Sequence, residues 1–305
     1  KDLTIARPDS PVPNLLAWLR LAKLYAAGNI LDALEGEWDK AASKLLDQLQ
    51  SARKVVKGSR TLITNLVGKA EMRIACEALA ALMSEPGCPD SVFRAILERT
   101  PPLEFAEYGS LPLVLEYRYR PEFNWNRFRR LEKRDFFSAL WFTLFTQPNR
   151  TRNCRHHLIL PIIKAERMEP YKWTKNPFEM PTVKRGWWWL RNPGGKVLLD
   201  QFVHAGGNSL ATVILKSFRT RTVFEMLRIS AELHLKYIPG KPVKEILETL
   251  ETYKAMDPCS GKPYRWNNEK QLLYSIGTDR KDDGGCNQRQ DRTGDFPLEV
   301  IHYVR

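Results

Sequence analysis

The sequence lacks several features that would identify a function class directly. It has no uninterrupted apolar stretch of about eighteen residues, and its richest apolar run, Phe136–Phe145, is too short, so no membrane-spanning helix is expected. It has no CxxC pair and no GxSxG or HExxH motif, the residues typical of zinc knuckles, serine hydrolases and metalloproteases. It also begins with Lys1-Asp2 in place of a start methionine, which we expect of a mature chain whose leader was removed.

Acidic residues are in the minority. The chain has 35 Asp and Glu against 48 Lys and Arg, a formal charge of +13, which indicates an acidic partner. Net charge does not distinguish an acidic protein, lipopolysaccharide or another anionic envelope component from nucleic acid.

Between Tyr117 and Arg134, basic and aromatic residues interleave. This pattern suits stacking on nucleic-acid bases with phosphate contacts, and it equally suits a strand and helix whose basic residues face solvent while the aromatic residues fill a core. We expect four of the basic residues to contact the acidic partner: Arg127, Arg129, Arg130 and Lys133.

Cysteine is scarce, and the five residues lack the spacing of a metal site: Cys76, Cys88, Cys154, Cys259 and Cys286. Cys76 and Cys88 flank the end of a predicted helix, and Cys259 and Cys286 flank a predicted hairpin. In an oxidising compartment each pair could close a short loop, and in the cytosol the same residues would be buried thiols. Cys154 would be left over.

Residues 1–100 are predicted to form a helical bundle that carries no active site. Apolar residues recur there at helical spacing, as in Leu45, Leu49, Ala52 and Val56, and again in Ile63, Val67, Ala70 and Ile74. Glycines at 28, 36 and 58 are predicted to end the helices.

Residues 101–205 are predicted to form a second region, because Pro101-Pro102 cannot continue a helix. This region is basic, rich in aromatic residues and without clear periodicity, and its tryptophans suggest an irregular core or an interface. Its Cys154-Arg155-His156-His157 cluster is more typical of a structural or surface role than of a metal site, since adjacent histidines rarely face one site.

Residues 206–305 are predicted to contain a long helix, a short helix and a hairpin. The long helix is expected to start near Asn208-Ser209 and to end before Pro239-Gly240, and the short helix follows Pro242. A strand near Tyr264–Trp266, a turn and a strand over Leu272–Gly277 come next, followed by an Asp- and Gly-rich tail.

The order and spacing of these elements resemble the C-terminal half of the major pseudopilins of type II secretion. The resemblance rests on Asp257-Pro258, Gly261–Tyr264 and Leu273–Asp279, and it covers about the last third of the chain. A pseudopilin begins with an apolar polymerising helix, whereas some two hundred residues precede the module here. The chain is therefore expected to be an envelope protein and not a pilus subunit, and its cysteine pairs are expected to be disulfides.

The resemblance also implies a calcium site in the terminal loop. Asp279 and Asp295 match the two aspartates of the family, Asp282 is an additional candidate beside Asp283, and Leu273 and Ser275 are placed to offer main-chain oxygens. Calcium binds six to eight oxygens, which such a loop could supply. A solvated acidic turn is the alternative.

The sequence therefore predicts an α+β protein with a helical N-terminal bundle, an irregular aromatic-rich middle region and a pseudopilin-like helix with a small antiparallel hairpin or sheet. The function expected is a non-enzymatic, periplasmic role in the bacterial envelope with an acidic partner. A cytoplasmic nucleic-acid-binding protein that uses residues 117–134 is the first alternative. An enzyme with a cleft in the middle region is the second.

Overall fold

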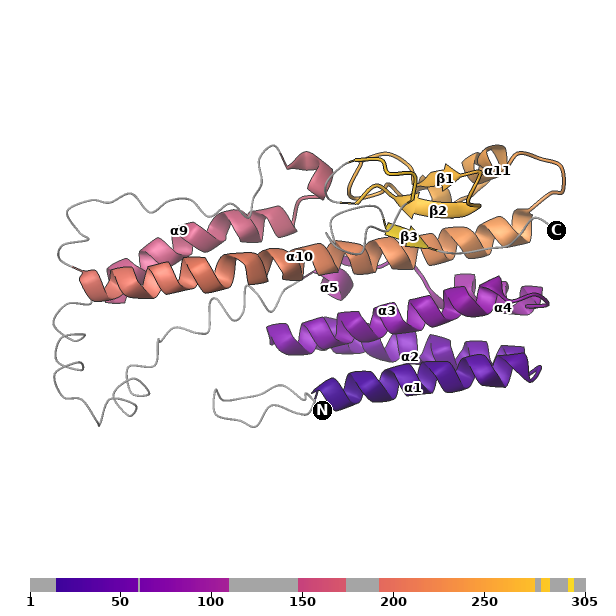
Figure 1. Cartoon of the computed structure of the whole chain (residues 1–305), viewed down its shortest axis with the longest axis horizontal. Helices are drawn as coiled ribbons and strands as arrows, with labels where there is room; N and C mark the ends of the chain where they lie inside the picture. The colour runs from indigo at the N-terminus through magenta and orange to yellow at the C-terminus, as the bar shows by residue number, and fades with distance from the viewer. Residues whose placement is uncertain are drawn as a thin grey trace. The chain divides into compact units, whose positions relative to one another are not determined.

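The computed structural model describes residues 15–59, 61–109, 148–173, 192–277, 281–285 and 296–298 (Figure 1). These residues form an α+β structure that is mostly helical and has a small antiparallel sheet. The chain divides into two compact units, one made of residues 1–112, 169–172 and 215–305, the other of residues 113–168 and 173–214. Across the described ranges, no helix is both long enough and apolar enough to cross a membrane.

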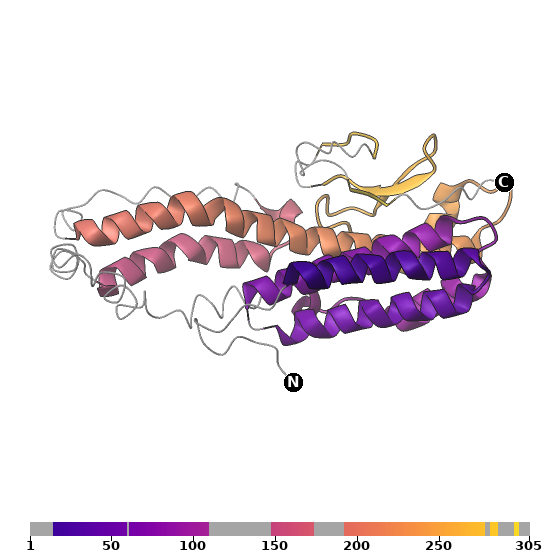
Figure 2. The same ribbon diagram turned by 60° about the horizontal axis from the view of Figure 1, so that its bottom comes forward.

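The first unit begins with four helices, α1 (Leu15–Leu34), α2 (Trp38–Gly58), α3 (Leu62–Ser84) and α4 (Asp90–Arg99). This confirms the predicted helical character of the N-terminal part. Helices α1, α2 and α3 lie side by side in both views of the chain (Figures 1 and 2). Their interior is made of apolar side chains that are fully buried, among them Leu45, Leu49, Met72, Leu79 and Phe93.

Helix α1 does not end at Gly28, where the sequence predicted a stop. The helix continues to Leu34, and the Asn29 side chain, which is buried, donates a hydrogen bond to the carbonyl oxygen of Tyr25 (2.8 Å). The chain turns only at Gly36, whose φ of +99° favours glycine and whose N–H bonds to the carbonyl oxygen of Ala33. A glycine on the exposed side of a helix costs stability without ending the helix.

The last of the four N-terminal helices stops before Pro101-Pro102, while the compact unit continues to residue 112. Helix α4 ends at Arg99, before the two prolines, and the short helix α5 (Phe105–Tyr108) follows with a capping box between Glu104 and Glu107. The Glu107 carboxylate forms a bidentate ion pair with Arg53 of α2, with Nε–Oε1 and Nη2–Oε2 distances of 3.0 and 2.9 Å. This nearly buried pair fastens α5 to α2.

Helix α10 (Pro193–Lys236) begins well before the predicted start near Asn208. Proline is favourable in the first helical turn, and the helix includes Gly206-Gly207, which directly precede the predicted start. From Leu215 onward α10 belongs to the first unit and is buried on almost every side, including the side chains of Phe218, Phe224 and Leu227.

The C-terminal module of the first unit consists of α11 (Val243–Thr249), the 3₁₀ turn η4 (Thr252–Lys254) and three strands. Strands β1 (Arg265–Asn267), β2 (Leu272–Ser275) and β3 (Phe296–Leu298) form an antiparallel sheet in the order β1-β2-β3. The predicted hairpin is therefore confirmed, while the third strand was not predicted. In Figure 1, the part of α10 in this unit runs between the bundle and the sheet.

Buried polar contacts join this module to α10. Glu225 accepts hydrogen bonds from the hydroxyl of Tyr264 (2.5 Å) and from Arg221 (2.7 Å). About two helical turns after Glu225, Glu232 accepts hydrogen bonds from the main-chain N–H groups of Glu251 and Thr252 and from the Thr252 hydroxyl. Helix α10 thus positions the residues that follow α11 and the residue that precedes β1.

The second unit contains α9 (Pro148–Glu166) and the first part of α10. Leu158, Ile162 and Ala165 are buried side chains of α9. The Trp173 indole donates to the carbonyl oxygens of Ala165 and Met168 at 3.1 and 3.2 Å, which closes the end of this helix. The interleaved basic and aromatic residues from Tyr117 to Arg134 lie outside the described residues.

Candidate functional site

A tight turn before strand β1 carries the candidate site. The Asp257 carboxylate is 1% exposed and accepts hydrogen bonds from the Cys259 N–H (3.0 Å) and the Ser275 hydroxyl (2.7 Å). The main chain of Asp257 also bonds to the Lys262 carbonyl oxygen and the Gly261 N–H. Because a buried carboxylate is stable only with such partners, these contacts fix the turn against β2.

Gly261 brings a distant segment against this turn. Its φ is +66°, and a Cβ added there would lie 2.7 Å from the ring of Tyr171, so a side chain fits neither the backbone nor the space. The Tyr171 N–H bonds to the Pro258 carbonyl oxygen (3.2 Å), and Arg221 of α10 donates to Glu169 (3.2 Å). Tyr171 is thereby held from both sides, in the 3₁₀ turn η2 (Pro170–Lys172).

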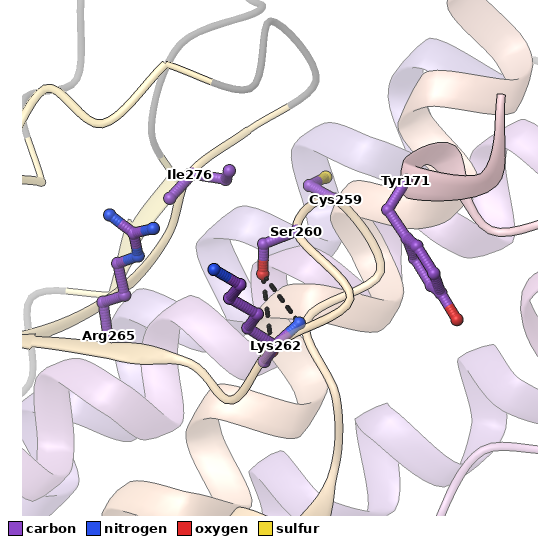
Figure 3. Close-up of a pocket in the computed structure, with 6 residues that line it drawn as sticks. All are labelled: Tyr171, Cys259, Ser260, Lys262, Arg265 and Ile276. Carbon is purple, nitrogen blue, oxygen red and sulfur yellow. Dashed lines mark hydrogen bonds between the residues drawn. The ribbon is translucent and has the colours of Figure 1, made fainter. Parts of the chain in front are cut away.

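The turn, η2 and strand β1 together enclose a depression of about 240 Å³. It is lined by an aromatic ring, a thiol, a hydroxyl, two basic groups and an apolar side chain: Tyr171, Cys259, Ser260, Lys262, Arg265 and Ile276 (Figure 3). In that view, the side chains of Lys262 and Arg265 extend into the space beside the turn, and the Tyr171 ring lies on the turn's other side.

The two basic residues of the depression differ in their charge partners. The Arg265 guanidinium forms an ion pair with Asp282, whose carboxylate also accepts bonds from the Tyr274 hydroxyl (2.9 Å) and the Gly284 N–H (3.1 Å). Lys262 takes part in no ion pair with the residues that the structure describes. Of the two cations, Lys262 is therefore the one that can pair with an added anion.

The chemistry of these groups suits binding better than catalysis. An ammonium and a guanidinium can both donate hydrogen bonds to a carboxylate or a phosphate. The guanidinium can do so with two parallel bonds. Among the described residues, the hydrogen bonds of the Ser260 hydroxyl go to the main-chain oxygen and N–H of Lys262, at 3.4 and 3.1 Å, and not to a basic side chain. A nucleophilic serine would need a basic side chain at that distance.

Three of the predicted calcium ligands, Asp282, Leu273 and Ser275, lie among the described residues, and each already has other partners. Asp282 is engaged by Arg265 and Tyr274, so an ion would have to compete with a guanidinium for that carboxylate. Leu273 and Ser275 belong to β2, the central strand, whose main-chain groups point along the sheet to β1 and β3. In the described ranges no three His, Cys, Asp or Glu side chains gather as a metal site would require.

These three described residues thus do not fit a calcium site by themselves. Asp279 and Asp295, the two positions matched to the family's aspartates, lie outside the described residues. The other predicted partner-binding residues also lie outside them: Arg127, Arg129, Arg130 and Lys133.

The predicted bond between Cys76 and Cys88 is absent from the structure, which carries both as thiols. Cys76 is buried inside α3, eight residues before the helix ends at Ser84, which places it roughly 12 Å along the axis from that end. Burial raises the pKa of Cys76 far above that of a free thiol, and burial, with Asp39 and Asp90 nearby, raises that of Cys88 to about 12.

Cys259 is fully buried in a small cluster with Leu272, Tyr274 and Ile276. Its predicted partner, Cys286, lies outside the described residues. Gly285, the residue before it, packs against the same cluster, since a Cβ there would lie 2.7 Å from Leu272 and 3.4 Å from Tyr274. The bond between Cys259 and Cys286 stays a prediction.

Sequence reasoning did not identify Lys262, Arg265 and Tyr171 as one site. Lys262 and Arg265 were visible in the Gly-Lys-Pro turn and the strand after it, while Tyr171 is ninety residues from Gly261 and no periodicity links the two. No protein-family model matches the sequence, and neither a curated protein nor a solved structure matches the chain.

Proposed function

We propose that this chain is a binding protein of the bacterial cell envelope that recognises an acidic partner with the depression at Lys262 and Arg265. The observation that carries the proposal is that these two cations line one depression, on a turn that Asp257 and Gly261 hold in place. The excess of 48 basic over 35 acidic residues supports it, because a positive chain attracts acidic partners over a distance.

The two cations have different roles in the proposed binding. Lys262 supplies a mobile point charge, whereas Arg265 is held at the rim by Asp282 and offers its remaining N–H groups. An acidic side chain of the partner would bind Lys262 first and share Arg265 with Asp282. Both contacts are partly open to water, so a single acidic group should bind weakly and several in a row more tightly.

The envelope part of the proposal rests on the pseudopilin-like order of elements. A long helix, a short helix and a hairpin follow one another as α10, α11 and β1-β2, and the predicted bond between Cys259 and Cys286 would suit an oxidising compartment. The long N-terminal part distinguishes the chain from a pilus subunit, so we propose recognition and not polymerisation.

Calcium remains a prediction that depends on Asp279 and Asp295. If these residues bind an ion, adding calcium after chelation should raise the melting temperature, and Asp279→Ala should abolish that rise. A bound ion at a hundredfold excess over its dissociation constant stabilises by about 2.7 kcal/mol. An unchanged melting temperature would contradict the predicted calcium site.

The binding proposal can be tested with a fluorescently labelled peptide of eight glutamates, measured by anisotropy. Lys262→Glu combined with Arg265→Glu should lower the affinity at least about tenfold, which corresponds to the loss of one charge-assisted contact. The matched control is Lys54→Glu combined with Lys244→Glu, which changes the net charge equally at two exposed lysines outside the depression.

The control should retain most of the affinity. Equal losses in the two double variants would mean that the peptide responds to net charge alone, and the proposed site would be wrong. Vesicles with anionic lipid, measured in the same way, separate a phosphate-bearing surface from an acidic protein as the source of the anionic group. A single-stranded oligonucleotide bound more tightly than either probe would favour the nucleic-acid alternative.

A further inference from the structure

Helix α1 exposes more large apolar side chains than a helix that only covers a core. The residues that it buries fully are small, namely Ala22, Ala26, Asn29 and Ala33, while Leu19 and Ile30 are partly buried against the same core. Six of its large residues are exposed: Leu16, Leu21, Leu24, Tyr25, Leu31 and Leu34. A helix at the surface of a globular protein normally shows the reverse arrangement.

The exposed area is large enough for an interface. The exposed fractions of these six side chains run from 48% for Tyr25 to 72% for Leu16. Together they expose on the order of 700 Å², more than the few hundred that a monomeric protein usually shows in one patch and close to the roughly 800 Å² that each partner of a standard interface buries. Helix α1 lies at the outer side of the bundle in both views (Figures 1 and 2).

The spacing of the leucines fits a second copy of the same helix. Leu21, Leu24, Gly28 and Leu31 follow one another at intervals of three, four and three residues, the repeat of a coiled-coil seam. A Cβ added to Gly28 would meet nothing within 4 Å, so the middle of this seam is open and two backbones can approach closely there.

The same face is symmetric about Ala27-Gly28. Leu24 lies three residues before Ala27 and Leu31 three after Gly28, and Leu21 and Leu34 lie six residues before and after. Two antiparallel copies of α1 would therefore pair Leu24 with Leu31 and Leu21 with Leu34, twice each, as a twofold interface requires.

Charge complementarity supports this antiparallel pairing. Arg20 lies seven residues before Ala27 and Glu35 seven after Gly28, so each Arg20 would face Glu35 of the second copy. Both residues are exposed, and neither forms an ion pair with the described part of its own chain.

We propose that the chain forms a homodimer through an antiparallel pair of α1 helices, with Ala27-Gly28 at the crossing point. The dimer would present two of the depressions at Lys262 and Arg265, although this interface is independent of that function. The partner that covers this face of α1 is a second copy of the chain. The size of the apolar area, the symmetric spacing of the leucines and the register of Arg20 opposite Glu35 each support this choice.

Sedimentation velocity of the full chain over a hundredfold range of concentration tests the proposal. The parent protein should sediment as a dimer, and Leu24→Glu combined with Leu31→Glu should sediment as a monomer. Ile63→Glu, a matched change at a half-exposed residue of α3, should stay dimeric. Circular dichroism melting of each variant shows that it is folded, which exposed positions should permit.

A charge exchange tests the register. Arg20→Glu and Glu35→Arg should each weaken the dimer about tenfold, since each places like charges opposite one another twice. The chain with both substitutions should regain the parent affinity, and an equimolar mixture of the two single variants should form a heterodimer. A monomeric parent, a dimer unaffected by the leucine substitutions, or a double variant without recovery would overturn the proposal. So would a parent that stays monomeric and binds lipid vesicles through this face.

Discussion

The two sides of helix α10 in the first unit are fastened by different forces. Toward the bundle, α10 presents mainly apolar side chains, such as Phe224, whose ring lies 5.4 Å from the Arg53 guanidinium of α2. Toward the C-terminal module, it presents Arg221, Glu225 and Glu232, which hold Tyr264 and Thr252.

This difference has a consequence for stability. Apolar burial is nearly independent of pH, whereas a buried carboxylate stabilises only while it is ionised and bonded. The module that carries Lys262 and Arg265 should therefore loosen under acid or on loss of one hydrogen bond, under conditions that leave the helical bundle folded. The predictions below compare the two sides directly.

The largest effect is expected on the bundle side. Phe224→Ala should lower the free energy of unfolding by about 3 to 5 kcal/mol, because the fully buried ring leaves a cavity between α10 and the bundle. Urea unfolding followed by circular dichroism measures it. Ile238→Ala, at a side chain that is 56% exposed, is the control and should change stability by less than about 0.5 kcal/mol. Similar losses in both variants would contradict the assigned role of the ring.

The second-largest effect on stability is expected from a disulfide bond in the C-terminal module. A bond between Cys259 and Cys286 would close a loop of 27 residues and stabilise by about 3 to 4 kcal/mol. Peptide mapping without reduction should recover the two residues in one linked pair, while Cys76 and Cys88 become alkylated only after unfolding. Cys259 recovered in alkylated form would refute the bond, and five reactive thiols would also refute the envelope assignment.

Glu232 should make the module sensitive to acid. Burial alone would raise its pKa, but hydrogen bonds from Lys236 and from Thr252 and Glu251 lower the pKa from 4.5 to about 2. A carboxylate with a depressed pKa stabilises the fold above its unfolded value, and this contribution is lost as pH falls from about 4.5 toward 2.

Glu232→Gln should therefore cost roughly 2 to 3 kcal/mol at neutral pH, and the difference from the parent protein should disappear near pH 2. Urea unfolding at several pH values checks this. Glu245→Gln, at an exposed residue of α11, is the control and should not alter the pH dependence. A Glu232→Gln cost that stays constant over the whole pH range would show that the carboxylate charge is irrelevant.

The smallest effect is expected from one hydroxyl group. Tyr264→Phe removes the bond to Glu225, which keeps its ion pair with Arg221, so we expect a loss of about 1 to 2 kcal/mol. Hydrogen exchange should show faster opening of β1 and β2 with little change in α2 and α3. Tyr25→Phe, at a residue of α1 remote from the module, should leave the exchange of β1 and β2 unchanged. Equal acceleration throughout the first unit would mean that the module and the bundle open together.

The helices and the hairpin could be predicted because their signals are local. Apolar spacing in α2 and α3 and the Asn267-Asn268 turn each act within a few residues. Helix ends were predicted less well. Gly28 and Gly206 are tolerated inside helices, because a long helix with many other contacts offsets the cost of a glycine.

The candidate site could be predicted only in part. The turn at Gly261-Lys262 is a local signal, but Tyr171 reaches it through the fold. The close approach of the Tyr171 ring, which excludes a Cβ at Gly261, is therefore visible only in the structure. The contacts of Asp282 could not be predicted for the same reason. As an isolated residue of an acidic loop it resembles a calcium ligand, and only the strand pairing brings Arg265 and Tyr274 to it.

Acetylation rates of individual lysines test the proposed binding site most directly. With a saturating concentration of the eight-glutamate peptide, Lys262 should be acetylated about tenfold more slowly than in the free protein, while Lys54 and Lys244 should react at unchanged rates. Mass spectrometry of digested samples resolves the three lysines. If all three are protected equally, or if Lys262 is not protected at all, the peptide does not bind at the depression and the proposed function is wrong.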